Sequence, residues 1–111
     1  MTRIYRSQQE CPVARTLNIV GDRWTVLVLR DLANGQRRFN DLLASLEGIS
    51  PNLLADRLKR LEEHGMVERV FYSQHPPRAE YHLTEKGSDF GGVLDAMFSW
   101  GRKHAGVGTG S

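Results

Sequence analysis

The residues from 50 to 65 constrain the fold of this chain most, because both ends of the segment carry signals for a helix terminus. Ser50 is a favoured N-cap residue, Pro51 suits the first helical position, and Gly65 follows the last turn. Leucines recur between these ends at the spacing of one helical face. They are Leu54, Leu58 and Leu61, with Leu53 beside them. The segment therefore predicts an amphipathic helix whose leucine face packs inward.

The opposite face of this helix is polar. At about 100° per residue, four side chains point away from the leucines: Asn52, Asp56, Lys59 and Glu63. On an isolated helix, such a face is most simply a solvated surface. Here a short helix and a tight turn precede it, and this arrangement favours a surface that recognises a partner.

Shorter elements are predicted on both sides of this helix. Residues 37–39 are expected to form a brief strand, and Asn40 is expected to cap a short helix at 41–46. After the amphipathic helix, residues 67–72 are rich in β-formers, and residues 79–83 alternate between apolar and polar. The connecting residues 73–78 are expected to be irregular, because two prolines in this stretch lack the N–H group that a strand ladder needs.

Two short helices followed by a hairpin predict a mainly α fold with a small β-hairpin, the winged helix-turn-helix. In this order of elements, one helix enters the DNA major groove and the hairpin tip reaches the neighbouring backbone. Basic residues concentrate in the same part of the chain, although Glu62, Glu63 and Glu68 dilute them. The net charge is only +2, so the distribution of charge is more informative than its total.

The N-terminal part of the chain predicts two further helices. Residues 1–11 are polar and are expected to form an arm. The first helix is expected to begin at Pro12 and to end at Gly21. Asp22 is expected to cap the second helix, which ends at residues 34–35. The apolar stripe of this second helix consists of Trp24, Leu27, Val28 and Leu32. Four aromatic residues are interpreted as core residues: Trp24, Phe39, Phe71 and Tyr81.

Thr84 is expected to cap a final helix that carries a continuous apolar stripe. The stripe consists of Phe90, Val93, Leu94, Met97, Trp100 and Gly101. So much apolar surface at one end of a small protein favours contact with a second copy of the chain, so we expect a homodimer. Residues 105–111 are rich in glycine and are expected to be disordered. Residues 12–104 then form the single folded domain.

Composition excludes several classes of protein. The chain has 111 residues, enough for one domain. No apolar run approaches the roughly 20 residues that span a bilayer. The start of the chain lacks the apolar core of a signal peptide, and the single cysteine permits no internal disulfide. The expected location is therefore the cytoplasm, without membrane association.

The sequence contains no recognisable catalytic or metal-binding motif. The four histidines are scattered along the chain, with no HExxH, CxxC or glycine-rich phosphate loop. They are His64, His75, His82 and His104. We therefore expect no enzymatic activity, no metal site and no cofactor.

The chain resembles the HxlR-type winged helix-turn-helix transcriptional regulators, relatives of the MarR-like group. The resemblance covers residues 11–101 and rests on CPV, GDRWTVLVLRDL, RRFNDLLASLEGISPNLLADRLKRLEEHGMVER, EYHLTEKG and a terminal WG, in this order. One departure is Asp22-Arg23, where we would expect Gly or Lys before the tryptophan. The resemblance implies a homodimeric repressor or activator that dimerises through its first and last helices. DNA contacts would come from the helix after Ser50 and from the hairpin, the wing.

The polar helix face is the first place to look for DNA contacts. We assign base-edge contacts to Asn52 and Lys59, with Asp56 as an acceptor from cytosine. Ser50 lies at the helix N-terminus, where backbone N–H groups also favour phosphate. A two-fold dimer would set its two recognition helices about one DNA turn apart, which favours a palindromic operator.

Further contacts to the DNA backbone are expected around this helix and at the wing. They are Arg37, Arg38, Asn40, Arg57 and Arg60 beside phosphate, and Gln74, His75 and Arg78 at the wing, where they could reach the minor groove. For Arg57, a surface ion pair with Asp56 or Glu62 is an alternative interpretation. The mixed charge of the helix face also keeps open an alternative function, a winged-helix module that binds protein and not DNA.

Cys11 is the one candidate for a reactive side chain. It directly precedes Pro12 at a predicted helix start, where the helix dipole favours the thiolate, and Arg15 lies one turn further on. In the family that the chain resembles, a cysteine at this place senses oxidants, quinones or aldehydes. A thiol that packs at the helix start or at the dimer interface is an equally open interpretation. With one cysteine in the chain, sensing would need an intersubunit disulfide, a small-thiol adduct or alkylation.

Overall fold

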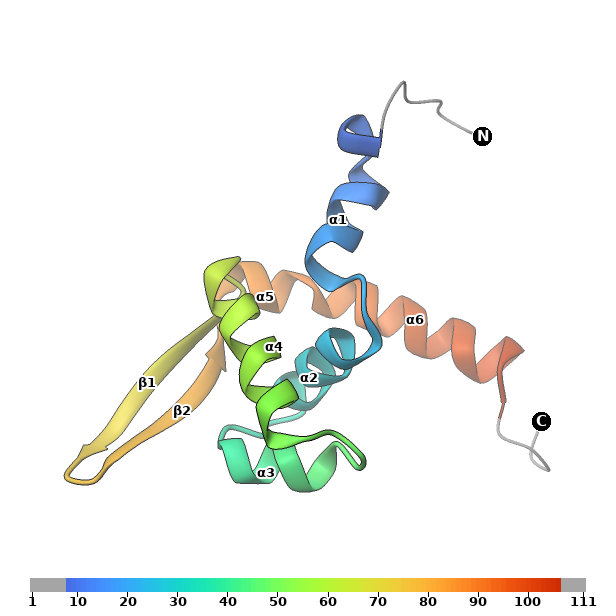
Figure 1. Ribbon diagram of the computed structural model, residues 1–111. Coiled ribbons are helices and arrows are strands. Elements are labelled where there is room, and N and C mark those ends of the chain that lie inside the picture. The colour runs from blue at the N-terminus through green and yellow to red at the C-terminus, as the bar shows by residue number, and fades with distance from the viewer. Residues whose placement is uncertain (1–7, 107–111) are drawn as a thin grey trace.

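The computed structural model describes residues 8–106. Over this range it consists of a short 3₁₀ helix, six α-helices and one antiparallel hairpin (Figure 1). The elements are η1 (Gln8–Glu10), α1 (Pro12–Val20), α2 (Arg23–Ala33), α3 (Phe39–Ser45), α4 (Pro51–Glu63), β1 (Val67–Gln74), β2 (Pro77–Leu83), α5 (Glu85–Asp89) and α6 (Gly91–His104). The mainly α winged helix-turn-helix fold is therefore confirmed. Within the described residues, no helix is long and apolar enough to cross a membrane.

The core lies where α2, α3 and α4 meet. The predicted leucine face of α4 is confirmed, because Leu54, Leu58 and Leu61 are all buried. They pack in one cluster with side chains from the neighbouring elements. These include Val28, Leu29 and Leu32 of α2, Leu42 of α3, Leu46 directly after α3, Met66, Val67 and Phe90. Burial of this leucine face fixes which side of α4 remains exposed.

The predicted helix starts are largely confirmed. The Ser50 hydroxyl accepts a hydrogen bond from the Leu53 N–H at 3.1 Å, and Pro51 is the first residue of α4. Gly65 has φ +73°, a conformation that glycine adopts without the strain of a Cβ. Local signals in the sequence therefore set both ends of this helix.

Two predictions around α3 are wrong. Residues 37–39 form no strand, because the chain turns directly into α3 after one backbone hydrogen bond, from the Tyr81 N–H to the Arg37 carbonyl at 2.7 Å. The N-cap is Arg38, whose backbone is extended, and no side chain caps this helix start. Asn40 consequently lies in the first turn and not at the cap. A single backbone hydrogen bond to β2 thus takes the place of the expected strand.

The hairpin of the wing is longer than we predicted from its two prolines. Its ladder continues to the pairs Ser73–Arg78 and Gln74–Pro77, so the irregular tip expected at residues 73–78 shrinks to a tight turn at His75 and Pro76. Pro77 is tolerated because it is the first residue of β2, where a missing N–H is least costly. The register of the two strands shifts between Phe71 and Ser73. This shift is a β-bulge at Tyr72.

The predicted aromatic core is correct except for Phe71. Trp24, Phe39 and Tyr81 are half-buried and pack against the core cluster. Phe71 is 48% exposed, so its assignment to the core is wrong. Alternation along a strand marks two faces, but toward the tip of a wing that projects from the body both faces are largely exposed (Figure 1).

The single C-terminal helix that we expected is divided into α5 and α6 at Phe90, which is buried. Thr84 caps α5 through the Gly87 N–H. A Cβ at Gly87 would lie 2.0 Å from the Met66 carbonyl oxygen, so α5 approaches the backbone before β1 closely. The predicted N-terminal arm falls largely outside the described residues, and so does the predicted disordered tail beyond residue 106.

The start of α2 is joined to α4 through Asp22. Its carboxylate accepts a hydrogen bond from the Thr25 N–H at 2.9 Å and lies 3.0 Å from Arg57 Nε. Burial would raise the pKa of Asp22, but the hydrogen bonds from Thr25 and the charge of Arg57 outweigh it and lower the pKa. The predicted cap is confirmed, and it also holds an arginine of the next long helix.

We predict that Asp22→Ala lowers the free energy of unfolding by about 1 kcal/mol at pH 7, because a helix cap is lost. Asp22→Asn should cost less, since an amide still caps the helix. The folded-state pKa of Asp22 lies below its ordinary value of 3.8. The stability from its charge is therefore present above that value and is lost as the pH falls through the folded pKa.

Urea denaturation at pH 7 and pH 3 tests this prediction. The difference between wild type and Asp22→Asn should be largest at pH 7 and should shrink at pH 3. Glu47→Gln is the matched control, because Glu47 is exposed and has no ion pair within residues 8–106. A difference for Asp22→Asn that does not change with pH would contradict the role of its charge.

Candidate nucleic-acid interface

The outward face of α4 carries the side chains that the helical pattern predicted. Asn52, Asp56, Lys59 and Glu63 are all exposed. Lys59 makes no ion pair within the described part of the chain, whereas Asp56 is ion-paired with Arg57. One face of a rigid helix thus offers an amide and an ammonium group to a partner. Both groups are able to donate hydrogen bonds to base edges.

Arg57 does not flank this exposed face as we expected. Its side chain is only 19% exposed and lies against Asp22. The alternative of a pair with Asp56 is confirmed, while Glu62 lies 3.6 Å from Arg69 of β1. Position 57 follows Leu54 by three residues and precedes Leu61 by four, so Arg57 leans toward the buried side and toward the start of α2.

Arg60 is more accessible than Arg57. Its side chain is 39% exposed, and Nη1 lies 3.5 Å from Asp22 Oδ2. A surface ion pair of this kind contributes little to stability, so the guanidinium can exchange Asp22 for another anion. Ser50 is exposed at the opposite end of α4, where its hydroxyl is used in the cap.

The residues predicted beside α3 lie in different surroundings. Arg37 is half-buried and donates from Nη1 to the Leu32 carbonyl at 3.0 Å, at the end of α2. Arg38 and Asn40 are exposed on the outside of α3. Arg38 therefore presents a cation at the junction between α3 and the wing, while Arg37 stabilises the chain that leads there.

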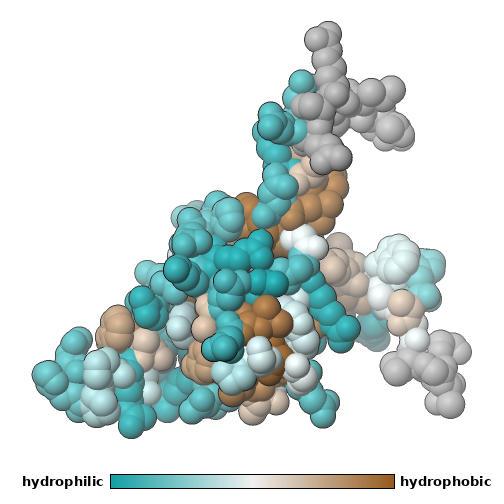
Figure 2. Space-filling view, in the orientation of Figure 1, coloured by the Kyte–Doolittle hydropathy of each residue, from teal (hydrophilic) through white to brown (hydrophobic). Residues whose placement is uncertain are grey.

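Three of the predicted contact residues lie at the wing tip and are exposed to solvent. Gln74, His75 and Arg78 are all exposed. Hydrophilic side chains cover much of the wing, in the lower left of Figure 2. The body attaches to the wing at its base, where Tyr81 is half-buried. Burial raises the pKa of the Tyr81 phenol; Arg69 opposes this rise and Glu62 adds to it.

Sequence reasoning missed Tyr72 on the wing. Its ring is 45% exposed, and the guanidinium carbon of Arg38 lies 4.8 Å from the ring centroid. In the sequence, Tyr72 lies among other β-forming residues, so nothing distinguishes it from an ordinary strand residue. The bulge that turns Tyr72 toward Arg38 has no signal in the local sequence.

Cys11 lies at the N-cap position of α1, and it is half-buried. Its side chain makes no capping hydrogen bond. The helix that it precedes projects from the body, and its last residue, Val20, is anchored in the core (Figure 1). Among residues 8–106, no group of three or more His, Cys, Asp or Glu side chains is arranged to hold a metal ion.

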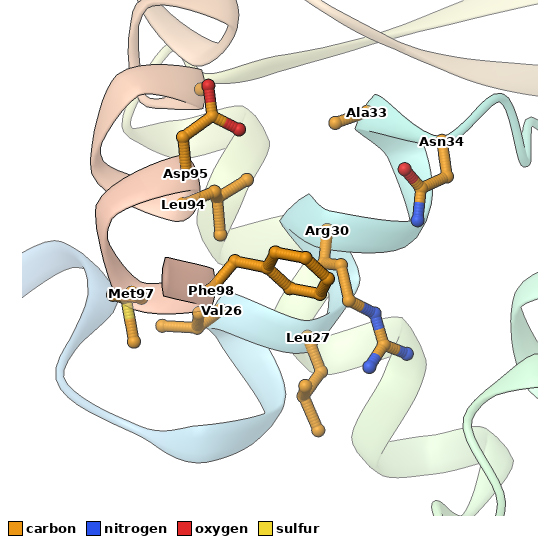
Figure 3. Close-up of a pocket in the computed structure, with 10 residues that line it drawn as sticks. Val26, Leu27, Arg30, Ala33, Asn34, Leu94, Asp95, Met97 and Phe98 are labelled. Atoms are coloured by element: carbon orange, nitrogen blue, oxygen red, sulfur yellow. The ribbon is translucent and has the colours of Figure 1, made fainter. Parts of the chain in front are cut away.

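An apolar groove lies between α2 and α6, away from the wing. It has a volume of about 500 Å³. Val26 and Leu27 of α2 line it together with Leu94, Met97 and Phe98 of α6. Figure 3 shows the Phe98 ring between the two helices, with Arg30 beside it. Met97 and Phe98 are 51% and 65% exposed, so the described chain leaves this surface open to a partner.

The comparisons with known proteins agree with this architecture. Residues 19–108 match the family described as HxlR-like helix-turn-helix. A relative in Synechocystis, named as the uncharacterized HTH-type transcriptional regulator sll1512, is 43% identical over 91 residues, which cover 82% of this chain and 67% of the relative. The proteins matched are named as regulators of transcription, which are not enzymes.

Two solved structures have the same fold and share about a third of their residues with this chain. The reduced form of the transcriptional regulator YodB from B. subtilis is 34% identical with a TM-score of 0.72, and the match covers 85% of this chain and 93% of YodB. The redox regulator HypR in its reduced form is 33% identical with a TM-score of 0.81, covering 87% and 96%. This chain therefore belongs to the HxlR-like helix-turn-helix family of transcriptional regulators.

Proposed function

We propose that this protein is a dimeric repressor that binds a palindromic DNA operator. The observation that carries the proposal is α4, whose leucine side is buried while Asn52 and Lys59 face solvent. A helix exposed in this way fits the major groove, which is about 12 Å wide. A repressor of this kind acts where the DNA is, which we propose to be the cytoplasm.

The exposed residues have distinct roles in this proposal. Asn52 and Lys59 read base edges, and the start of α4 at Ser50 approaches a phosphate. Arg38, Asn40 and Arg60 contact the backbone, and Gln74, His75 and Arg78 contact DNA at the wing. Asp56 is exposed, and we keep it as an acceptor from cytosine. Arg37 and Arg57 are engaged within the chain, so we propose that they act mainly by holding the helices in place.

Dimerisation is supported by apolar surface on the first and last helices. Val13 and Leu17 of α1 are 67% and 56% exposed, and Figure 2 shows brown side chains along one side of this projecting helix. Val93, Met97 and Trp100 of α6 are also exposed. Exposed apolar patches of this kind mark interaction surfaces in soluble proteins. A second copy of the chain would cover both helices and pair two α4 helices for one operator.

We further propose that Cys11 makes the repressor sensitive to oxidants or small electrophiles. Its half-buried thiol and the absence of a capping bond support this role. HypR, whose fold this chain shares, is named as a redox regulator. Modification at the start of α1 would alter the helix that we propose binds the partner, and through it the spacing of the two α4 helices.

We predict that substitution of Lys59 and substitution of Arg78 change DNA binding in different ways. Lys59→Ala should reduce discrimination between the operator and mismatched DNA, because it removes a base contact. Arg78→Ala should weaken binding to all duplexes and reduce the salt slope by about one, because it removes a phosphate contact. Titrations of the DNA that flanks the protein's own gene, at several salt concentrations, measure both effects.

Unchanged affinity and salt slope in both variants would remove these assignments. Lys103→Ala controls for the loss of a positive charge away from α4 and the wing, because Lys103 is an exposed residue of α6. If the wild-type protein binds no duplex DNA but captures a protein, the alternative function as a protein-binding module is favoured. A reporter gene behind the operator distinguishes repression from activation.

We predict that a substitution that introduces a charge into the apolar surface of α6 dissociates the dimer. Wild type should sediment as a dimer of 12.6 kDa chains, and Met97→Asp should sediment as a monomer, because burial of an unpaired carboxylate is costly. Val70→Asp is the matched control, since Val70 is a 43% exposed apolar residue on the wing. A monomeric wild type at micromolar concentration, or equal dissociation of both variants, would contradict the assignment of this surface.

Oxidants or quinones are predicted to change DNA binding by the wild type and not by Cys11→Ser. The substitution removes the nucleophilic thiol and keeps a side chain of similar size. Gel-shift assays before and after treatment, followed by reduction, measure the change and its reversal. Equal responses from the two proteins would eliminate Cys11 as the sensor.

A further inference from the structure

The bulge in β1 turns one wing residue toward the helical body. Phe71 pairs with Ala79 and Ser73 pairs with Arg78, so Tyr72 between them has no partner in the ladder. Bulges of this kind bend a strand and change the direction of a side chain. The result here is that the Tyr72 ring lies 4.8 Å from the guanidinium carbon of Arg38, which does not belong to the wing.

Arg38 is held by both strands of the wing. It is the N-cap residue of α3, and its Nε lies 3.7 Å from Glu80 Oε2 on β2. Glu80 is fixed in turn by His82, whose Nε2 lies 3.1 Å from Glu80 Oε1. Tyr72, Arg38 and Glu80 therefore link the wing to the first helix of the helix-turn-helix pair. We call these three residues the Arg38 bridge.

The Arg38 bridge contacts the wing nearer its tip than the backbone link between wing and body does. The backbone link between wing and body, from the Tyr81 N–H to the Arg37 carbonyl, lies nearer the base. Beyond it the wing is a two-stranded hairpin, and such hairpins are only marginally stable on their own. The Arg38 bridge joins the wing to α3 closer to the exposed residues Gln74, His75 and Arg78.

We infer that Tyr72 is a positioning residue for DNA binding, which holds Arg38 against the wing and so fixes the direction of the wing tip. The inference rests on the proposed function, because the wing must contact DNA for its direction to matter. A fixed tip lets Arg78 reach phosphate without first losing conformational freedom. The ring face makes the contact with Arg38, so the Tyr72 hydroxyl is not required.

Three variants separate this role from a general effect of aromatic residues on the wing. Tyr72→Ala removes the ring, and Tyr72→Phe keeps it. Phe71→Ala is the matched control, because Phe71 is 48% exposed and lies 5.5 Å from the guanidinium carbon of Arg69 on the same strand. The ion pair between Arg69 and Glu62 of α4 does not depend on that ring.

The first readout uses the free protein. In ¹⁵N relaxation measurements, the amides of Gln74, His75 and Arg78 should become more mobile in Tyr72→Ala than in wild type. Tyr72→Phe and Phe71→Ala should resemble wild type. Equal tip mobility in all four proteins would overturn the inference, whether or not DNA is bound.

The second readout is a double-mutant cycle on the operator. Tyr72→Ala should weaken binding by about two- to fivefold, the range expected for loss of an exposed contact between a cation and a ring. Arg78→Ala should then cost less affinity in the Tyr72→Ala protein than in wild type, because the tip is no longer held near the DNA.

Additive effects of Tyr72→Ala and Arg78→Ala would overturn the inference, because they would mean that Tyr72 and Arg78 act independently. Equal weakening by Tyr72→Phe and Tyr72→Ala would also overturn it, since the hydroxyl would then be the contact group. A wild type that binds no duplex DNA contradicts the proposed function, and the relaxation measurements still test the bridge in that case.

Discussion

Burial of the leucine face of α4 is the interaction on which the rest of the structure depends. Each buried leucine contributes about 1.5–3 kcal/mol, whereas an exposed ion pair contributes about 0–1 kcal/mol. Leu54, Leu58 and Leu61 are therefore expected to contribute more than the ion pairs around Asp22. Those polar contacts have a different effect, because they set how α4 lies against the start of α2.

Once α4 is anchored, its outward face and the wing become parts of one surface. The Tyr81–Arg37 backbone bond attaches β2 to the chain before α3, and the Arg38 bridge joins the same two regions nearer the tip. The helices α1 and α6, which carry exposed apolar side chains, lie elsewhere on the molecule (Figure 1). The fold thus separates the surface proposed for DNA from the one proposed for a second subunit. Cys11 lies beside the latter.

Much of the fold could be predicted because its signals are local. Ser50, Asp22 and Thr84 cap helices through bonds to residues three positions away, so each cap can be recognised within one turn. The errors occur where a distant contact overrides the local pattern. The expected strand before α3 does not form, because Arg37 makes one backbone hydrogen bond to β2 and the chain then enters α3. The final helix divides at Phe90, whose side chain is buried in the core.

For the candidate site, the sequence by itself determined that Asn52 and Lys59 would lie opposite the leucines, since helical periodicity fixes the faces of α4. Only the tertiary structure decided which charged residues remain available to a partner. Arg57 is mostly buried against Asp22, whereas Arg38 stays 56% exposed while it contacts Tyr72 and Glu80. These pairs join residues far apart in the chain. Their distances depend on how the elements pack, and no local pattern of residues records that packing.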